Sequence, residues 1–150
     1  MDANELHVKL AHPATTSIEI PIAWGEMDAL GHVNNVVFFR YIESARVDFL
    51  RKSGSHALRD ETGIGFILQF VEMRFRQPLV FPDTVRVDTK LVSIDEDRFT
   101  LAHAVVSRKT NDVAAIGRGT IVTFDYAKGA KVAIPGAIRD AIIAIEKRAG

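Results

Sequence analysis

Apolar and polar positions alternate near the start of the chain. Between Thr16 and Ala23, Ile18, Ile20 and Ile22 are separated by polar or small residues. A period of two is typical of a strand with one buried face. The pattern predicts a first strand over residues 16–23.

A helical period follows. Between Val36 and Arg51, polar residues recur at steps of four, four and three, and apolar residues occupy the opposite face. The polar set is Arg40, Ser44, Asp48 and Arg51. The apolar set is Phe38, Ile42, Ala45 and Phe49. The β-branched and aromatic residues here leave a strand open, but Asn34 and Asn35 favour a helix because Asn is a preferred N-cap.

In the second half of the chain, apolar and polar residues alternate again, in runs over residues 70–76, 85–91, 99–108 and 113–124. Short turns between these runs predict an antiparallel meander. Pro135 precedes apolar residues at helical spacing, which predicts a short final helix. The pattern predicts no helix or strand over residues 54–65.

The expected order is one strand, a long helix, four strands and a short helix. It predicts one α+β domain over residues 1–150, with a five-stranded antiparallel sheet against one long helix. One helix covers only part of such a sheet, so we expect self-association to protect the remaining edge or face.

The amino-acid composition argues against several classes of function. The 150 residues are 47% hydrophobic and carry 19 basic and 19 acidic residues, with no cysteine. The balanced charge argues against nucleic-acid binding, which depends on phosphate neutralisation. The absence of cysteine excludes thiol chemistry and disulfides. No apolar run is long enough for a membrane span, and the N-terminal residues lack a secretory pattern, so we expect a cytoplasmic protein that does not act at membranes.

The stretch from Trp24 to Arg46, WGEMDALGHVNNVVFFRYIESAR, carries the candidate chemistry. Asn34 and Asn35 begin the helix, where unpaired backbone N–H groups attract negative charge. Asp28 precedes them across a turn at Gly31. A carboxylate beside such a terminus can serve as a base or nucleophile next to an oxyanion site, a pairing that suits acyl transfer.

A simpler interpretation stays open, because Asp, Gly and Asn are common turn residues. By itself His32 fits a turn or a supporting role better than that of a general base. Glu26, Asp28 and His32 do not form a recognised metal-ligand spacing, so no metal site is expected. Glu43 and Arg46 are three residues apart on the helix and are expected to pair.

The same stretch resembles the hot-dog-fold thioesterases of the 4-hydroxybenzoyl-CoA thioesterase type. Their motif is an Asp, two residues, Gly, often His-Val-Asn-Asn, and then a helix bearing Tyr, Glu and Arg. The matching residues are Asp28, Gly31, His32, Val33, Asn34, Asn35, Tyr41, Glu43 and Arg46. The close match covers roughly residues 18–50, and beyond it the order of elements agrees.

The resemblance implies an acyl-CoA thioesterase whose catalytic carboxylate is Asp28. The backbone N–H of Asn35 would polarise the thioester carbonyl, His32 joins the candidate catalytic group, and Gly31 and Asn34 are expected beside the substrate. The resemblance also implies a homodimer or homotetramer with the site at a subunit interface. Coenzyme A enters as part of the substrate, acyl carrier protein is a possible alternative, and no cofactor is expected.

Two departures from the family pattern concern the acyl group. Glu26 stands where many relatives carry a second Asp, and Phe38 and Phe39 stand where relatives often have Tyr. Both favour an apolar or simple aryl acyl group over a hydroxylated aromatic one.

The phosphates of coenzyme A would need cations. Arg108 and Lys109 stand beside a predicted turn, although a solvated surface pair fits them equally well. Arg118 lies between Gly117 and Gly119, which indicate a bulge or a close backbone approach, either to a pantetheine arm or as a structural kink. These three cations are the candidate phosphate ligands, and Arg74, Arg76 and Lys90 are further cations available to the phosphates.

Two other functions are compatible with the expected fold. A hot-dog dehydratase or hydratase would pair histidine and carboxylate differently from this motif. A non-catalytic acyl-CoA-binding module would usually carry a further domain, for which 150 residues leave no room.

Overall fold

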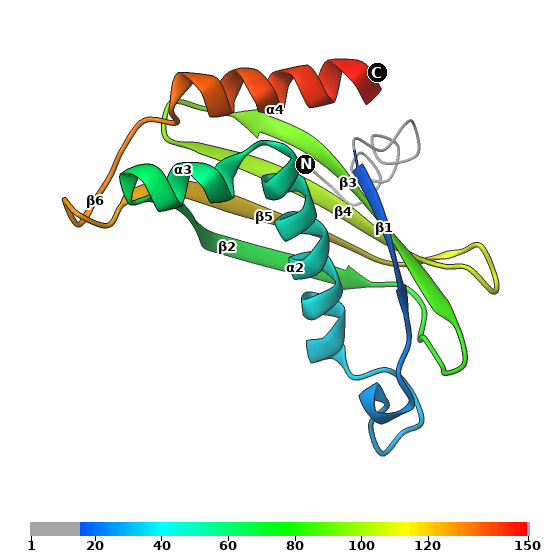
Figure 1. Cartoon of the computed structure of the whole chain (residues 1–150). Helices are drawn as coiled ribbons and strands as arrows, with labels where there is room; N and C mark the ends of the chain where they lie inside the picture. Colours follow the sequence, from blue (N-terminus) through cyan, green and yellow to red (C-terminus); the bar gives the residue numbers. More distant parts are fainter. Residues whose placement is uncertain (1–15, 150) are drawn as a thin grey trace.

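A computed structural model describes residues 16–149 of the chain (Figure 1). The elements in chain order are β1 (Thr16–Pro21), η1 (Trp24–Glu26), α2 (Asn35–Lys52), α3 (Ser55–Thr62), β2 (Ile64–Phe75), β3 (Thr84–Ile94), β4 (Arg98–Ser107), β5 (Val113–Asp125), β6 (Ala130–Lys131) and α4 (Gly136–Ala149). The N-terminal residues on which we expect no secretory signal lie largely outside this range.

The strands form one antiparallel sheet in the order β1-β3-β4-β5-β2, and the two-residue β6 extends the pairing of β5. The predicted α+β class, with five main strands against one long helix, is confirmed. The predicted meander is right for β3, β4 and β5 but wrong for β2, which pairs with β5 instead of β3. The connection over residues 76–83 is not a tight turn, because it carries the chain from the β2 edge to the far side of the sheet.

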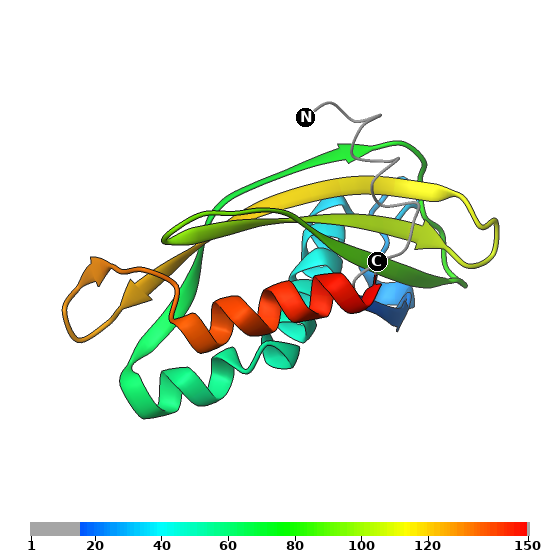
Figure 2. The same cartoon turned by 90° about the horizontal axis from the view of Figure 1, so that it is seen from above.

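Helix α2 lies across the concave face of the sheet, and Figure 2 shows all three helices on that one side. Its predicted apolar face is confirmed, since Phe38, Ile42, Ala45 and Phe49 are all buried. Close approach needs Gly117 on β5: a Cβ there would lie 3.1 Å from the Cδ1 atom of Ile42. The first hydrophobic core therefore lies between α2 and the sheet.

A second core lies under α4. Ile134, Ile138, Ile142 and Ile145 pack with Phe49 of α2 and with apolar residues of β4 and β5. The final helix is longer than predicted, with 14 residues. Together α2 and α4 cover the concave face of the sheet.

Helix α3 has no counterpart in the sequence-based prediction. It is bracketed by Gly54 and Gly63, which both have positive φ angles. Its eight residues, SHALRDET, are mostly polar, and Ser55 is its one buried residue. Because so little of it is buried, its sequence lacks the apolar period that identifies a helix. None of the helices in the described range is long and apolar enough to cross a membrane.

Candidate active site

Asp28 lies at the tip of a small hairpin. Met27 and Val33 form an isolated antiparallel bridge, and the N–H of Asp28 donates to the carbonyl of His32 at 2.8 Å. Gly31 closes the turn onto the Asp28 carbonyl at 3.0 Å with a φ of 78°, a conformation that favours glycine. The carboxylate Oδ1 of Asp28 accepts from the N–H of Leu30 at 2.9 Å. The turn therefore orients an exposed carboxylate through one of its two oxygens.

The start of α2 follows directly. Asn34 is the N-cap: its Oδ1 accepts from the N–H of Val36 at 3.0 Å. Its own N–H donates to the carbonyl of Glu26 at 3.0 Å. Within the described part of the chain, the N–H of Asn35 has no acceptor. The arrangement leaves one backbone donor at the helix terminus free for a ligand.

Glu26 ties the hairpin to the helix. Its carboxylate Oε1 accepts from the N–H of Ala23 at 2.6 Å and from the hydroxyl of Tyr41 at 3.1 Å. Burial, followed by the charge and hydrogen bond of Glu26, raises the pKa of the Tyr41 phenol, so this hydroxyl stays a proton donor. The sequence indicated Glu26 as a departure from the family pattern and as part of a rejected metal-ligand set, not as a positioning residue. Its positioning role depends on a contact between residues 15 apart.

A cleft of about 540 Å³ contains the candidate catalytic group. It is lined by Asp28, His32, Val33, Asn35, Phe38, Phe75, Arg76, Gln77 and Pro78. Phe38 and Phe75 meet edge to face, with ring centroids 5.2 Å apart. The cleft thus combines a carboxylate, a free N–H donor and an aromatic wall.

The two residues predicted to lie beside the substrate, Gly31 and Asn34, both have local structural roles. Gly31 forms the turn and Asn34 caps the helix, and neither lines the cleft. The predicted pairing of Glu43 with Arg46 is confirmed at 3.9 Å. Burial, more than the opposing effect of Glu43, lowers the pKa of the Arg46 guanidinium.

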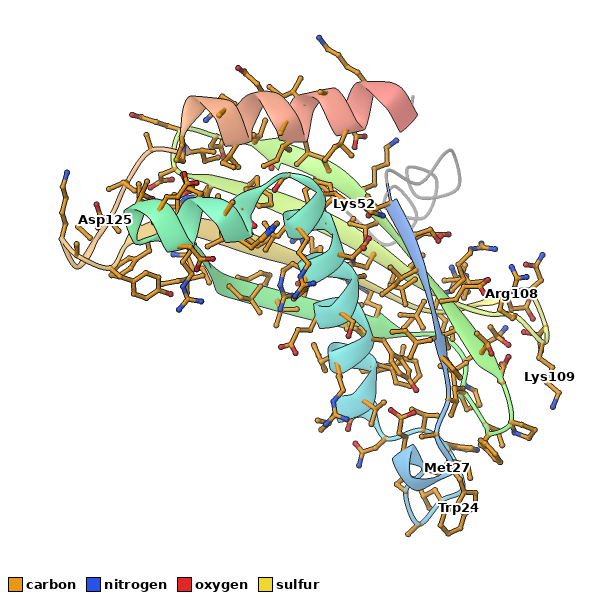
Figure 3. All side chains as sticks on the ribbon, in the orientation of Figure 1. Trp24, Met27, Lys52, Arg108, Lys109 and Asp125 are labelled. Carbon is orange, nitrogen blue, oxygen red and sulfur yellow. The ribbon has the colours of Figure 1, made fainter. Side chains whose placement is uncertain are left out.

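The three predicted phosphate ligands lie outside the Asp28 cleft. Arg108 pairs with Glu19 at 3.3 Å, and the backbone N–H of Lys109 donates to Asp83 at 3.1 Å. Both line a separate cleft of about 520 Å³ beside Pro82. Figure 3 shows them at the β4–β5 turn, apart from Trp24 and Met27 at the turn that leads to Asp28.

Arg118 lies on the sheet face away from α2, where it pairs with Glu72 at 2.5 Å. The close approach indicated by Gly117 and Gly119 is made by protein side chains: an added Cβ would lie 3.1 Å from Ile42 and from Leu68, respectively. The two glycines are therefore packing positions within the chain, and strand pairing continues without a register shift through both of them.

Comparison with known proteins agrees with this arrangement. The family model of the thioesterase-like superfamily matches residues 22–142. The long-chain acyl-CoA thioesterase FadM of Escherichia coli K12 is 24% identical over 122 residues, which is 81% of this chain and 92% of that protein.

Solved structures give the same result. A thioesterase of Thermus thermophilus, complexed with coenzyme A and Zn, superposes with a TM-score of 0.79 at 27% identity, covering 90% of this chain and 96% of that one. A gentisyl-coenzyme A thioesterase gives 0.75 at 26% identity, covering 85% and 99%.

The chain belongs to the thioesterase-like superfamily. Its curved antiparallel sheet around α2 is the hot-dog fold, and the predicted resemblance is confirmed. The class of enzyme that family and fold define is the thioester hydrolases.

Proposed function

We propose that the protein hydrolyses the thioester of an acyl-coenzyme A to a free carboxylic acid and coenzyme A, with Asp28 as the reacting carboxylate. The observation that carries this proposal is the single cleft holding the Asp28 carboxylate and the free N–H of Asn35. The relatives that act on long-chain acyl-CoA and gentisyl-CoA support the substrate class.

The chemistry follows from this pairing. The thioester carbonyl accepts from the N–H of Asn35, which stabilises the negative charge that develops on oxygen, and the positive end of α2 adds to this effect. Asp28 either attacks the carbonyl carbon, giving an anhydride that water opens, or removes a proton from an attacking water. By either route a C–O bond forms, the C–S bond breaks, and the thiolate leaves and takes up a proton. Neither route needs a metal or cofactor, so we expect activity to survive chelation.

The walls of the cleft favour an apolar or simple aryl acyl group. Phe38 and Phe75 supply a hydrophobic surface, and burying a ring or alkyl chain there is favourable by about 25 cal/mol per Å² of apolar surface. Phe39 meets the Phe75 ring edge to face, with centroids 6.3 Å apart, and is not among the residues that line the cleft.

We expect the working unit to be a homodimer, or a homotetramer built from it. Strand β2 ends the sheet, so its outer edge lacks a strand partner within the described part of the chain. Four of its large apolar side chains are exposed: Ile67, Leu68, Phe70 and Phe75. A long apolar edge of this kind invites pairing with a second copy.

The test is release of free thiol from short, long and aryl acyl-CoA esters by the wild type and by Asp28→Asn. The chain has no cysteine, so a thiol-reactive dye gives no protein background. We expect Asp28→Asn to cut turnover by orders of magnitude with folding intact, because an amide oxygen can still accept from Leu30. An unchanged rate in Asp28→Asn would remove this carboxylate from the mechanism. No release from any ester would favour an acyl-carrier-protein substrate or a binding module.

A further inference from the structure

Several arginines of α2, α3 and the β2 region have no carboxylate partner. Within the described range, five arginines have neither an ion pair nor a side-chain hydrogen bond: Arg40, Arg51, Arg59, Arg74 and Arg76. All five lie on α2, on α3, or at the end of β2. Among the described carboxylates of α2, α3 and β2, two have no ion pair, Asp60 and Glu61, so unpaired positive charge is in excess on these elements.

Two of these arginines line a second cleft, of about 280 Å³, between α2, α3 and the start of β2. Its lining includes the basic residues Arg51, Arg59 and His56 and the apolar residues Leu50 and Phe66. The Arg59 guanidinium lies 5.4 Å from the centroid of the Tyr126 ring, which holds it in place. Asp60 is the single carboxylate among the residues that line this cleft.

The two clefts border opposite ends of the same edge strand. The Asp28 cleft includes Phe75 and Arg76 at the end of β2, and the second cleft includes Gly65 and Phe66 at its start. Both clefts also contain α2 residues, so they open on the helical side of the sheet. In Figure 1, α3 lies beside the start of β2 and follows the C-terminal end of α2. The turn that precedes α2 lies at the N-terminal end of α2.

Two copies of an edge strand can pair antiparallel about a two-fold axis through the strand middle. Such an axis places the start of one β2 beside the end of the other. It therefore brings the second cleft of one subunit next to the Asp28 cleft of its partner. Arg51 and Arg59 would then extend a site that already contains Arg76.

We propose that the cleft between α2 and α3 completes the substrate site of the partner subunit, where Arg51 and Arg59 bind the phosphates of the coenzyme A part. This proposal rests on the thioesterase function proposed above. Guanidinium groups suit phosphate because they donate in a planar fork and stay charged. The substrate phosphates also offset the positive charge that pairing would concentrate there.

The first test compares Michaelis constants. Arg51→Ala with Arg59→Ala should raise KM for acyl-CoA on the order of tenfold or more while kcat changes little, because the lost contacts are to the carrier. An acyl-pantetheine ester, which lacks the nucleotide, should show no such rise. Arg74→Ala is the matched control: this arginine is also unpaired, but it follows Met73 and precedes Phe75 and so lies on the other face of β2.

The same measurement separates the two candidate phosphate sites. Arg108→Ala with Lys109→Ala should leave KM near the wild-type value. A raised KM in that variant, with none in the Arg51 and Arg59 variant, would overturn the proposal and support phosphate binding at the β4–β5 turn. An equal rise with the acyl-pantetheine ester would also overturn it.

The second test asks which subunit supplies the arginines. Heterodimers are purified through two different tags, one subunit carrying Asp28→Asn and the other carrying both arginine substitutions. If the arginines act across the interface, one site in each heterodimer has both an intact Asp28 and intact arginines. The heterodimer should then show the wild-type KM at about half the wild-type turnover.

If the arginines act within their own subunit, the one site with an intact Asp28 lacks its arginines. The heterodimer would then show only the raised KM, which overturns the shared site. Failure of the thioesterase function looks different: the wild type would release no thiol, or Asp28→Asn homodimers would remain active.

Discussion

At the scale of single residues, His103 is a polar group enclosed in the core. Its side chain is fully buried, and its Nδ1 shares a 2.8 Å hydrogen bond with the Thr89 hydroxyl. Its Nε2 has no protein partner within the described range. Burial, together with the nearby charge of Arg46, lowers the pKa of His103 to about 3. The folded protein therefore holds this imidazole neutral.

This neutral imidazole predicts a pH-dependent stability. In the unfolded chain a histidine titrates near 6.5, so below that pH the unfolded state binds a proton that the folded state does not. The free energy of unfolding should fall by up to about 1.4 kcal/mol per pH unit between pH 6.5 and 3 from this group alone, with no contribution above pH 6.5. Urea unfolding across this range should show a shallower fall for His103→Gln. Equal slopes in the two proteins would mean that His103 takes up a proton in the folded state.

The candidate catalytic residues could be predicted from sequence because they depend on neighbours a few residues apart. Asp28, Gly31 and the start of the helix at Asn35 are fixed by one turn and one cap, so their spacing indicated a carboxylate close to a helix start, while the catalytic assignment came from the family resemblance. The contact of Glu26 with Tyr41, across 15 residues, needed the tertiary structure. The side of the sheet that Arg118 occupies also depended on the pairing of β5 with its neighbours.

At the scale of elements, the approach of α2 to the sheet depends on Gly117. A Cβ at this position would lie 3.1 Å from Ile42 Cδ1, and 3.3 Å from both the Glu72 carbonyl and the Met73 Cε. The backbone oxygen cannot move without disturbing β2, so the helix or the strand must shift. The paired glycines in the sequence indicated a close approach but not the element that makes it.

We expect Gly117→Ala to destabilise the protein by about 1–3 kcal/mol, the usual cost of overpacking. Displacement of α2 should also lower kcat, since the helix carries Asn35 into the cleft. Gly136→Ala, at the start of α4, is the control: a Cβ there meets nothing within 4 Å, so the change should leave stability equal or raise it by up to about 1 kcal/mol. Thermal unfolding of both variants makes the comparison. Equal stability would place the closest contact of α2 elsewhere.

The strands show what apolar–polar alternation can and cannot predict. Alternation identified β3, β4 and β5 and the short turns between them, but it does not encode partners. The edge position of β2 follows from the connection over residues 76–83, in which the N–H groups of Arg76 and Gln77 both donate to the Ala114 carbonyl. The sequence did not predict helix α3, because few of its residues are buried and it therefore lacks an apolar period.

At the scale of the whole molecule, the exposed edge of β2 is the surface on which self-association is expected to depend. It is a 12-residue edge strand with four exposed large apolar side chains, whereas the opposite edge strand, β1, has six residues in the described range. Exposure of such an edge favours association, and a lysine placed there is a common natural protection against pairing. The proposed shared site depends on this same edge.

Phe70→Lys should therefore convert the dimer into a monomer. Phe70 is 48% exposed in the single chain, so the monomer should lose little stability. Val80→Lys is the control, since Val80 is 46% exposed but lies in the connection after β2. Light scattering should give a dimer or tetramer for the wild type and for Val80→Lys, and a monomer for Phe70→Lys. The monomer should also show a raised KM for acyl-CoA, because Asp28 would retain its own cleft but lack the partner's arginines. A monomeric Phe70→Lys variant with the wild-type KM would show that each chain binds its substrate alone.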